Sequence, residues 1–143
     1  MRTARTAQTV TAPTTLHVAL ECRPETPRTA RHLAGAFLHG LDPALDQDAA
    51  EVVVLVISEL VTNAVRHSGG RACALRLSAC SEAIAVAVSD ESHVLPRPRE
   101  ADIAGEGGGF GWSMVCRMAT AVAVTEEPEG KTINAVIPRQ PLN

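Results

Sequence analysis

The chain has 143 residues, of which 45% are hydrophobic, enough for one domain with a buried core. Its formal net charge of −3 is mildly acidic, its basic residues are not clustered, and only 2% of its residues are aromatic. These values argue against direct nucleic-acid binding, which relies on a basic surface or on aromatic stacking.

The cysteines and the hydrophobic runs exclude further classes. Four cysteines lie far apart with no Cys-x-x-Cys pair, so we expect small buried residues in a reducing compartment rather than a zinc site or a redox dithiol. They are Cys22, Cys73, Cys80 and Cys116. The N-terminus has no apolar signal region, and no run approaches about 18 apolar residues. The sequence therefore predicts a soluble, cytoplasmic protein with no membrane partner.

The N-terminal part predicts a tail, a strand and a helix. Residues 1–14 show no periodicity and are expected to be disordered ahead of a single domain at 15–140. Apolar residues then alternate as in a half-buried strand, at Leu16, Val18 and Leu20. Thr26 and Pro27 predict the N-cap and first turn of an amphipathic helix that ends at Gly40.

A long helix is predicted for residues 43–67, with a start signal at Asp42-Pro43 and a stop at Gly69-Gly70. The β-branched run at 52–57 favours a strand by propensity alone. Length and period favour the helix instead, because the polar residues mostly recur at intervals of three or four. These residues are Asp48, Glu51, Glu59, Thr62, Asn63 and Arg66. Most of the remaining circumference is apolar, so we expect the helix to be buried.

An antiparallel pair of strands follows, joined by a turn at Ser81-Glu82. The apolar residues of each strand share one face: Cys73, Leu75 and Leu77, then Ile84, Val86 and Val88. Asp90 continues the apolar row of the second strand, so its carboxylate is expected to face whatever covers the sheet. Taken alone, an aspartate at a strand end is more often a turn or capping residue than a ligand.

The segment 91–106 has no regular period and is expected to be a lid over a pocket. It runs through a glycine-rich stretch into a short helix at 112–120, whose predicted apolar stripe is Trp112, Val115, Cys116 and Ala119. Glycines before a helix leave backbone N–H groups free to approach an anion. A merely flexible loop is an equally good interpretation of these glycines by themselves.

The chain ends in a predicted hairpin of strands at 121–125 and 132–137, with Pro138 at its end. The order of the elements predicts an α+β fold, a two-layer sandwich with helices packed on one face of a mixed, mainly antiparallel sheet. No internal repeat and no second domain is indicated.

Glu59 and Asn63 are the strongest candidates for a ligand site. They are four residues apart, so on a helix they project from one face, with Thr62 and Arg66 beside them. A carboxylate and an amide on a mostly buried helix are costly to desolvate unless a polar partner meets them, which favours a ligand pocket over a solvated stripe. Arg66 and His67 either reach a ligand or cover the helix end, and we prefer the second interpretation.

The conjunction of these features resembles the GHKL, or Bergerat-fold, ATPases, and within them the small branch of anti-sigma factors and serine-protein kinases. The resemblance covers about residues 16–138 and includes the boxes of that family in their order. It implies a histidine kinase-like ATP-binding domain whose cofactors are ATP and Mg²⁺.

The resemblance also implies roles for individual residues. Asn63 would coordinate Mg²⁺ bridging the phosphates, and Glu59 would orient or deprotonate the attacking hydroxyl. Asp90 would accept a hydrogen bond from the adenine amino group, with Ser92 beside it where many relatives have glycine, and Thr132 would support that aspartate. The glycine box that closes on the phosphates would be Gly107, Gly109 and Gly111.

The implied function is that of an anti-sigma factor with serine-protein kinase activity toward an anti-sigma-factor antagonist, able to sequester a sigma factor and to form a homodimer. The alternative is a non-catalytic, ATP-dependent protein-binding switch that controls a transcription regulator. Glu59 beside Asn63 favours the kinase, whereas Phe110 and Trp112 around the glycine box favour the switch. A structural domain without nucleotide ranks last.

Overall fold

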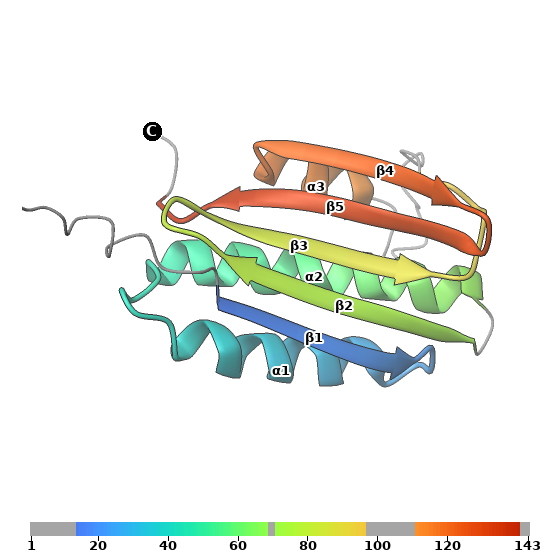
Figure 1. Cartoon of the computed structure of the whole chain (residues 1–143), viewed down its shortest axis with the longest axis horizontal. Coiled ribbons are helices and arrows are strands. Elements are labelled where there is room, and N and C mark those ends of the chain that lie inside the picture. Colours follow the sequence, from blue (N-terminus) through green and yellow to red (C-terminus); the bar gives the residue numbers. More distant parts are fainter. Residues whose placement is uncertain (1–13, 69–70, 97–110, 141–143) are drawn as a thin grey trace, which may run out of the picture.

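The structure, a computed structural model of the chain, describes residues 14–68, 71–96 and 111–140. This part of the chain forms five strands and three helices (Figure 1). In chain order they are β1 (Thr14–Glu21), α1 (Thr26–His39), α2 (Gln47–Ser68), β2 (Ala72–Ala79), β3 (Ala83–Asp90), α3 (Gly111–Met118), β4 (Ala121–Glu127) and β5 (Gly130–Pro138).

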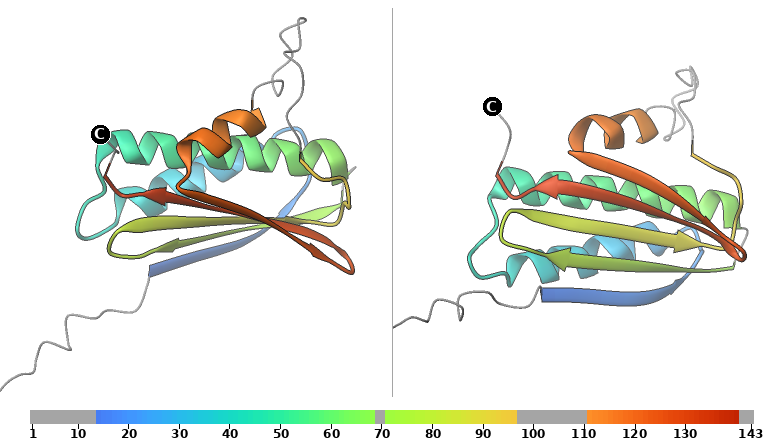
Figure 2. Two further views of the ribbon diagram at one scale, coloured as in Figure 1. Left: turned by 90° about the horizontal axis from the view of Figure 1, so that it is seen from above. Right: turned by 45° about the horizontal axis from the view of Figure 1, so that its top comes forward.

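The strands form one sheet in the order β1-β2-β3-β5-β4, and each neighbouring pair is antiparallel. The helices cover one face of this sheet, as the two views of Figure 2 show. α2 packs against β2, β3 and β5, with α1 on one side of it and α3 on the other. The α+β two-layer fold predicted from the sequence is confirmed, and its sheet is wholly antiparallel over the described strands rather than mixed.

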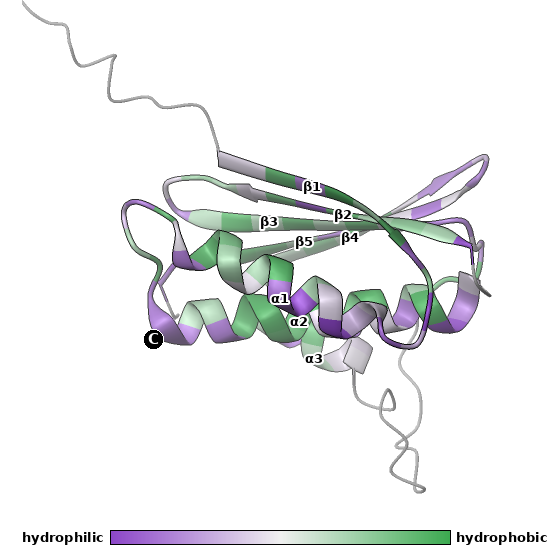
Figure 3. Ribbon diagram, turned by 90° about the horizontal axis from the view of Figure 1, so that it is seen from below, coloured by the Kyte–Doolittle hydropathy of each residue, from purple (hydrophilic) through white to green (hydrophobic). Residues whose placement is uncertain are grey.

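The hydrophobic core lies between the sheet and α2. Alternate residues of the central strands are buried because they face the helices, among them Leu75, Leu77, Ile84, Val86, Ile133 and Ile137. α2 meets them with a stripe at helical spacing that includes Val53, Val56, Ile57, Leu60 and Val61. Full burial of each such side chain contributes roughly 1.5–3 kcal/mol. Figure 3 shows the hydrophobic residues concentrated along the strands and α2, with hydrophilic residues at the tip where β4 meets β5.

α1 spans the predicted range, but Thr26 is not its N-cap. The capping position belongs to Glu25, which makes no side-chain cap hydrogen bond. The Thr26 hydroxyl instead donates to the carbonyl of Glu21 and accepts a hydrogen bond from the Arg23 N–H at 3.0 Å. Thr26 therefore fastens the connection between β1 and α1, while Pro27 occupies the first turn as predicted.

α2 begins at Gln47 rather than at residue 43. The Asp46 carboxylate accepts a hydrogen bond from the Ala49 N–H at 3.1 Å, which is the geometry of an N-cap. The predicted start signal, Asp42-Pro43, lies in the preceding loop and has a cis peptide bond. The β-branched run at 52–57 is helical, as its length and period predicted.

α3 keeps only part of its predicted apolar stripe. Val115 is buried, and Trp112 and Ala119 pack against the core. Cys116 is exposed, and Met114 packs against the core in its place. The prediction for Cys116 was wrong because a short helix at the edge of a layer buries a narrower face than a long central one.

The cysteines differ from expectation in two ways. Cys80 and Cys116 are exposed rather than buried. Cys22 and Cys73 are buried as expected. They lie next to each other where the pairing of β1 with β2 ends, so two thiols that are far apart in the sequence are close in space. Burial, followed by the adjacent Cys22 thiol and the Asp90 carboxylate, raises the pKa of Cys73 to about 12. That thiol therefore stays protonated at neutral pH.

Thr14, the last residue of the predicted tail, is the first residue of β1. The rest of the predicted tail, residues 1–13, lies outside the described part of the chain. Within residues 14–68, 71–96 and 111–140, no helix combines the length and the apolar character needed to cross a membrane.

Candidate functional site

A cavity of about 390 Å³ opens beside the C-terminal half of α2. Its walls come from α2, from residues 94–96 after β3, and from the N-terminal end of α3. Among the described residues, α2 contributes the polar side chains of Glu59, Thr62, Asn63, Arg66 and His67. Apolar walls are added by Leu95, Trp112 and Val115. A few polar groups converging in a partly apolar hollow of this size are typical of a small-molecule site.

Glu59 and Asn63 face this cavity from adjacent turns of α2. Both are half-buried, and their spacing of four residues places their side chains next to each other on one face of the helix. Leu60, Val61 and Ala64 are buried in the core and hold this part of α2 in place. The structure thus brings the acid and the amide together on one wall, as the sequence predicted, while their roles as ligands stay predictions.

Gly111, the first residue of α3, lies directly against Glu59. A Cβ atom at Gly111 would lie 2.0 Å from Glu59 Oε1 and 2.9 Å from its Cδ, so a larger residue fits only if Glu59 moves. The N-terminal end of a helix carries a partial positive charge, which stabilises a carboxylate there. Gly111 therefore lets α3 approach Glu59, a contact that the sequence analysis did not foresee.

The rest of the predicted glycine box falls outside the described residues. This applies to Gly107 and Gly109, and to the part of the predicted lid that spans 97–106. The first part of that segment is described, and its residues 94–96 form a wall of the cavity.

Arg66 and His67 line the same cavity, in the last turn of α2. The sequence interpretation preferred a helix-end role for both. The structure supports both roles together, because the last turn of α2 is also a wall of the cavity. A guanidinium on the wall that carries Asn63 favours an anionic ligand. Both residues therefore line the candidate site, and their roles as ligands stay predictions.

Asp90 lies at the end of β3, in phase with buried Val86 and Val88, and is only 7% exposed. The sheet register places it directly opposite Lys131 on β5. Lys131 Nζ donates to Asp90 Oδ1 at 2.9 Å and to Oδ2 at 3.0 Å. The side chain of Asp90 is 1% exposed and that of Lys131 is 0% exposed. Asp90 is therefore sealed by an ion pair and does not line the cavity described above.

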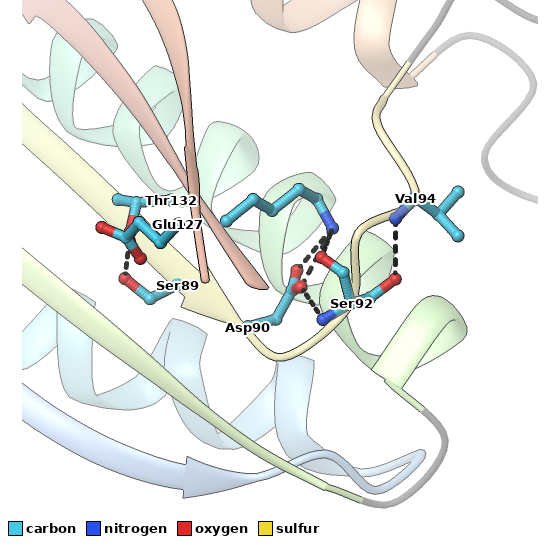
Figure 4. Close-up of polar contacts among 7 residues, drawn as sticks. Ser89, Asp90, Ser92, Val94, Glu127 and Thr132 are labelled. Atoms are coloured by element: carbon cyan, nitrogen blue, oxygen red, sulfur yellow. Dashed lines mark hydrogen bonds and ion pairs between the residues drawn. The ribbon is translucent and has the colours of Figure 1, made fainter. Parts of the chain in front are cut away.

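Ser92 completes the contacts around Asp90 (Figure 4). Its N–H donates to Asp90 Oδ1 at 2.8 Å, and its carbonyl accepts from Lys131 Nζ at 3.3 Å. Its hydroxyl accepts from the Val94 N–H at 3.0 Å. The polar groups of Ser92 are thus engaged within the chain, and they fix the segment that runs from β3 to the cavity wall.

Thr132 does not lie beside Asp90. The register pairs it with Ser89, and the two hydroxyl oxygens are 2.7 Å apart (Figure 4). Thr132 also donates to Glu127 at 3.3 Å, on the sheet face that points away from the helices. Alternation along a strand sends neighbours to opposite faces, so Thr132 and Asp90 lie on different faces of the sheet, and the support of Asp90 by Thr132 stays a prediction. The sequence signal for Lys131 instead was its phase with Ile133, Ala135 and Ile137.

The predicted ATP site has a phosphate end at the cavity and an adenine end at Asp90, and these two ends fit ATP differently. The cavity offers amide and carboxylate oxygens with a nearby guanidinium, which suits Mg²⁺ and phosphate. Within the described residues, no group of three or more His, Cys, Asp or Glu side chains is placed to hold a metal. At the other end, the Asp90 oxygens are taken by Lys131 and Ser92 and do not fit an adenine amino group as they stand.

A helix-covered antiparallel sheet, with an acid and amide pair lining a cavity at the end of its central helix, defines the class of GHKL-type ATP-binding domains. The chain belongs to the family described as the histidine kinase-like ATPase domain, whose model matches residues 20–137. This membership supports the predicted superfamily and an ATP-binding function.

Among solved structures, the chain is similar to the histidine kinase domain of the blue-light activated histidine kinase EL346 from Erythrobacter litoralis, with 29% identity and a TM-score of 0.44. The match covers 63% of this chain and 44% of that chain, so it spans less than half of the kinase structure. No curated protein sequence matches the chain significantly.

Proposed function

We propose that this chain is an ATP-binding regulatory protein of the cytoplasm, namely an anti-sigma factor that phosphorylates a serine of an anti-sigma-factor antagonist and otherwise sequesters a sigma factor. The observation that carries the proposal is the pairing of Glu59 with Asn63 on one wall of the cavity. Family membership supports the nucleotide. The choice of partners rests on the sequence resemblance.

The residues of the cavity suit distinct tasks in such a reaction. When bound, Mg²⁺-ATP supplies the phosphoryl group that is transferred. Asn63 presents an uncharged amide oxygen, a hard ligand of the kind that Mg²⁺ prefers. Arg66 adds positive charge on the same wall, which stabilises phosphate oxygens. Glu59 presents a carboxylate that accepts the proton of the substrate hydroxyl.

The surroundings of Glu59 suit a proton acceptor. Its carboxylate is held against the first residue of α3 because Gly111 has no side chain to displace it. The contact places the carboxylate beside the backbone N–H groups at the start of α3, which restricts its orientation. Glu59 is also half-buried, so its position is defined by packing as well as by charge.

A phosphotransfer assay with a matched pair of variants tests this proposal. The purified chain is incubated with Mg²⁺-ATP and a panel of purified anti-sigma-factor antagonists from the organism that encodes it, and phosphoserine is measured. We expect transfer to one antagonist, with a loss of at least about 10²-fold in Glu59→Gln. Glu51→Gln makes the same change at an exposed position two turns earlier on α2 and is expected to keep full activity. Absence of transfer throughout, or full transfer by Glu59→Gln, contradicts the kinase.

The ion pair between Lys131 and Asp90 favours a second function, a nucleotide-dependent switch without phosphotransfer. A base that contacts Asp90 must first separate this pair, and Ser92 connects the pair to the segment that forms the cavity wall. Nucleotide binding would then change the shape of this end of the molecule. A captured partner whose affinity differs with and without Mg²⁺-ATP, in the absence of transfer, supports the switch. Equal affinities in both states contradict it, because no differential binding exists to drive a change.

A further inference from the structure

Among the described residues, Lys131 has the largest side chain that is fully buried, and this side chain carries a charge. An ammonium group has three donors, and here all three are engaged. Two reach the oxygens of Asp90 at 2.9 and 3.0 Å, and the third reaches the Ser92 carbonyl at 3.3 Å. Burying such a group is costly unless it is paired and fully hydrogen-bonded, so its position is fixed by these contacts.

Asp90 is correspondingly closed to an outside donor. Oδ1 accepts hydrogen bonds from both Lys131 Nζ and the Ser92 N–H, while Oδ2 accepts from Lys131 Nζ. With 1% of the side chain exposed, neither oxygen faces solvent. A neutral amino group that competes for these oxygens would replace a charge-assisted bond by a weaker one and would leave a buried ammonium without its partner. The ion pair is therefore the stronger interaction.

The close approach of β5 to β3 maintains this arrangement. Gly130 precedes Lys131, and a Cβ atom there would lie 2.0 Å from the Asp90 carbonyl oxygen and 2.7 Å from the Glu91 Cα. The start of β5 thus lies against the backbone around Asp90, and Lys131 follows directly on the helix-facing side of the sheet. Lys131, which competes with an outside donor for the Asp90 carboxylate, therefore belongs to the strand that pairs with β3.

We infer that Lys131 is an internal competitor for the Asp90 carboxylate and determines the base specificity of the nucleotide site. With Lys131 in place, the chain binds nucleotides through their phosphates and does not select adenine by its amino group. Removal of the ammonium opens Asp90, raises the affinity for ATP and creates a preference for a base that carries an amino donor. This inference rests on the proposed nucleotide site at the cavity.

Calorimetric titration with two nucleotides tests it. Mg²⁺-ATP and Mg²⁺-ITP carry the same phosphates, but the hypoxanthine of ITP has a carbonyl oxygen where adenine has its amino group. We expect the wild type to bind both within about threefold, and Lys131→Thr to bind ATP at least about tenfold more tightly than ITP. Asn134→Thr alters the outward face of the same strand and is expected to behave as the wild type.

The outcomes separate the inference from the proposed function. The inference is overturned if the wild type already prefers ATP over ITP by tenfold or more. It is also overturned if Lys131→Thr leaves both affinities unchanged, and the ion pair is then purely structural. If neither protein binds either nucleotide, the proposed function falls together with the inference.

A second variant keeps the test decisive if Lys131→Thr does not fold, as judged by circular dichroism. Lys131→Met combined with Asp90→Asn removes both charges, so no unpaired ion is buried. The carbonyl oxygen of the new amide is then open to an adenine amino group. We expect this double variant to bind ATP at least about threefold more tightly than ITP, and equal affinities overturn the inference.

Discussion

Lys131 and Asp90, 41 positions apart in the sequence, form a buried ion pair in which Nζ lies 2.9 and 3.0 Å from the two carboxylate oxygens. The pairing of β3 with β5 places the two residues opposite each other on the helix-facing side of the sheet. Through Ser92, the pair also fixes the chain that leads from β3 to the cavity wall. It is both a stabilising contact and a constraint on the candidate site.

Removal of the ammonium alone is expected to destabilise the fold. Lys131→Met leaves the Asp90 carboxylate buried without its counter-ion, which costs about 3–5 kcal/mol. Urea denaturation measures this as a fall in the free energy of unfolding. Lys131→Met combined with Asp90→Leu removes both charges and is expected to regain most of the loss. A single-variant loss below about 1 kcal/mol shows that the carboxylate is reached by water or is neutral.

Gly111→Ala is expected to separate stability from activity. The new methyl group meets the end of the flexible Glu59 side chain, which is able to swing away, so the free energy of unfolding changes by less than about 1 kcal/mol. The carboxylate is then displaced by more than 1 Å, which is enough to lower the proposed phosphotransfer by roughly 10²-fold. Thermal denaturation and the phosphotransfer assay measure the two effects. Unchanged transfer shows that the contact between Gly111 and Glu59 does not position the carboxylate.

Gly130→Ala is expected to have the opposite profile. Here the methyl group meets backbone atoms of Asp90 and Glu91, which do not move independently, so β5 has to shift at a cost of about 1–3 kcal/mol or more. Gly35→Ala in α1 is a matched control, since a Cβ atom there meets nothing within 4 Å and is expected to stabilise the helix by roughly 0.5–1 kcal/mol. Equal melting temperatures for the two variants contradict the close approach at Gly130.

The cysteines are expected to divide into a fast and a slow pair in thiol labelling. Cys80 and Cys116 are exposed and should react rapidly with a disulfide reagent at pH 8, whereas Cys22 and Cys73 should react only on unfolding. Burial raises the pKa of Cys73 to about 12, so it contributes almost no thiolate at that pH. Peptide mapping after timed labelling identifies the residues. Rapid labelling of Cys73 in the native protein contradicts this division.

The raised pKa of Cys73 makes the free energy of unfolding depend on pH in a defined direction. The folded-state pKa of Cys73 lies above the ordinary value of 9.0 for a cysteine thiol, so the contribution to stability is fully present below pH 9 and is lost as the pH rises toward about 12. The effect of this one thiol has to be separated from every other effect of high pH. The comparison is therefore between wild type and Cys73→Ala, and the wild type is expected to lose stability more steeply above pH 9.

The start of α2 is tested by Asp46→Ala. Loss of the cap to the Ala49 N–H is expected to lower the free energy of unfolding by about 1 kcal/mol. Asp42→Ala removes the aspartate that the sequence favoured as the start signal and is expected to change it by less than about 0.5 kcal/mol. The reverse order of effects in urea denaturation contradicts the cap at Asp46.

The helical and strand periodicity of the sequence was enough to place much of the candidate site. Helical spacing put Glu59 and Asn63 on one face of α2, and strand alternation put Asp90 in phase with the buried row of β3. Both inferences depend only on residues a few positions apart, whose geometry follows from the type of element. The same alternation, applied to β5, would have placed Lys131 inward and Thr132 outward. The resemblance assigned Thr132 to the support of Asp90, whereas the phase of Thr132 in β5 places it on the other face of the sheet.

Amphipathic period and helix length in the sequence by themselves determined the layers, the helical state of the β-branched run in α2, and the acid and amide on its cavity face. Three features of the site were determined only by packing between distant segments. They are the contact of Gly111 with Glu59, the place of Arg66 and His67 on the cavity wall, and the ion pair of Lys131 with Asp90. Each depends on the register or approach of elements that are far apart in the chain. A local pattern states which face a residue occupies, whereas its partner on that face is chosen when the layers pack together.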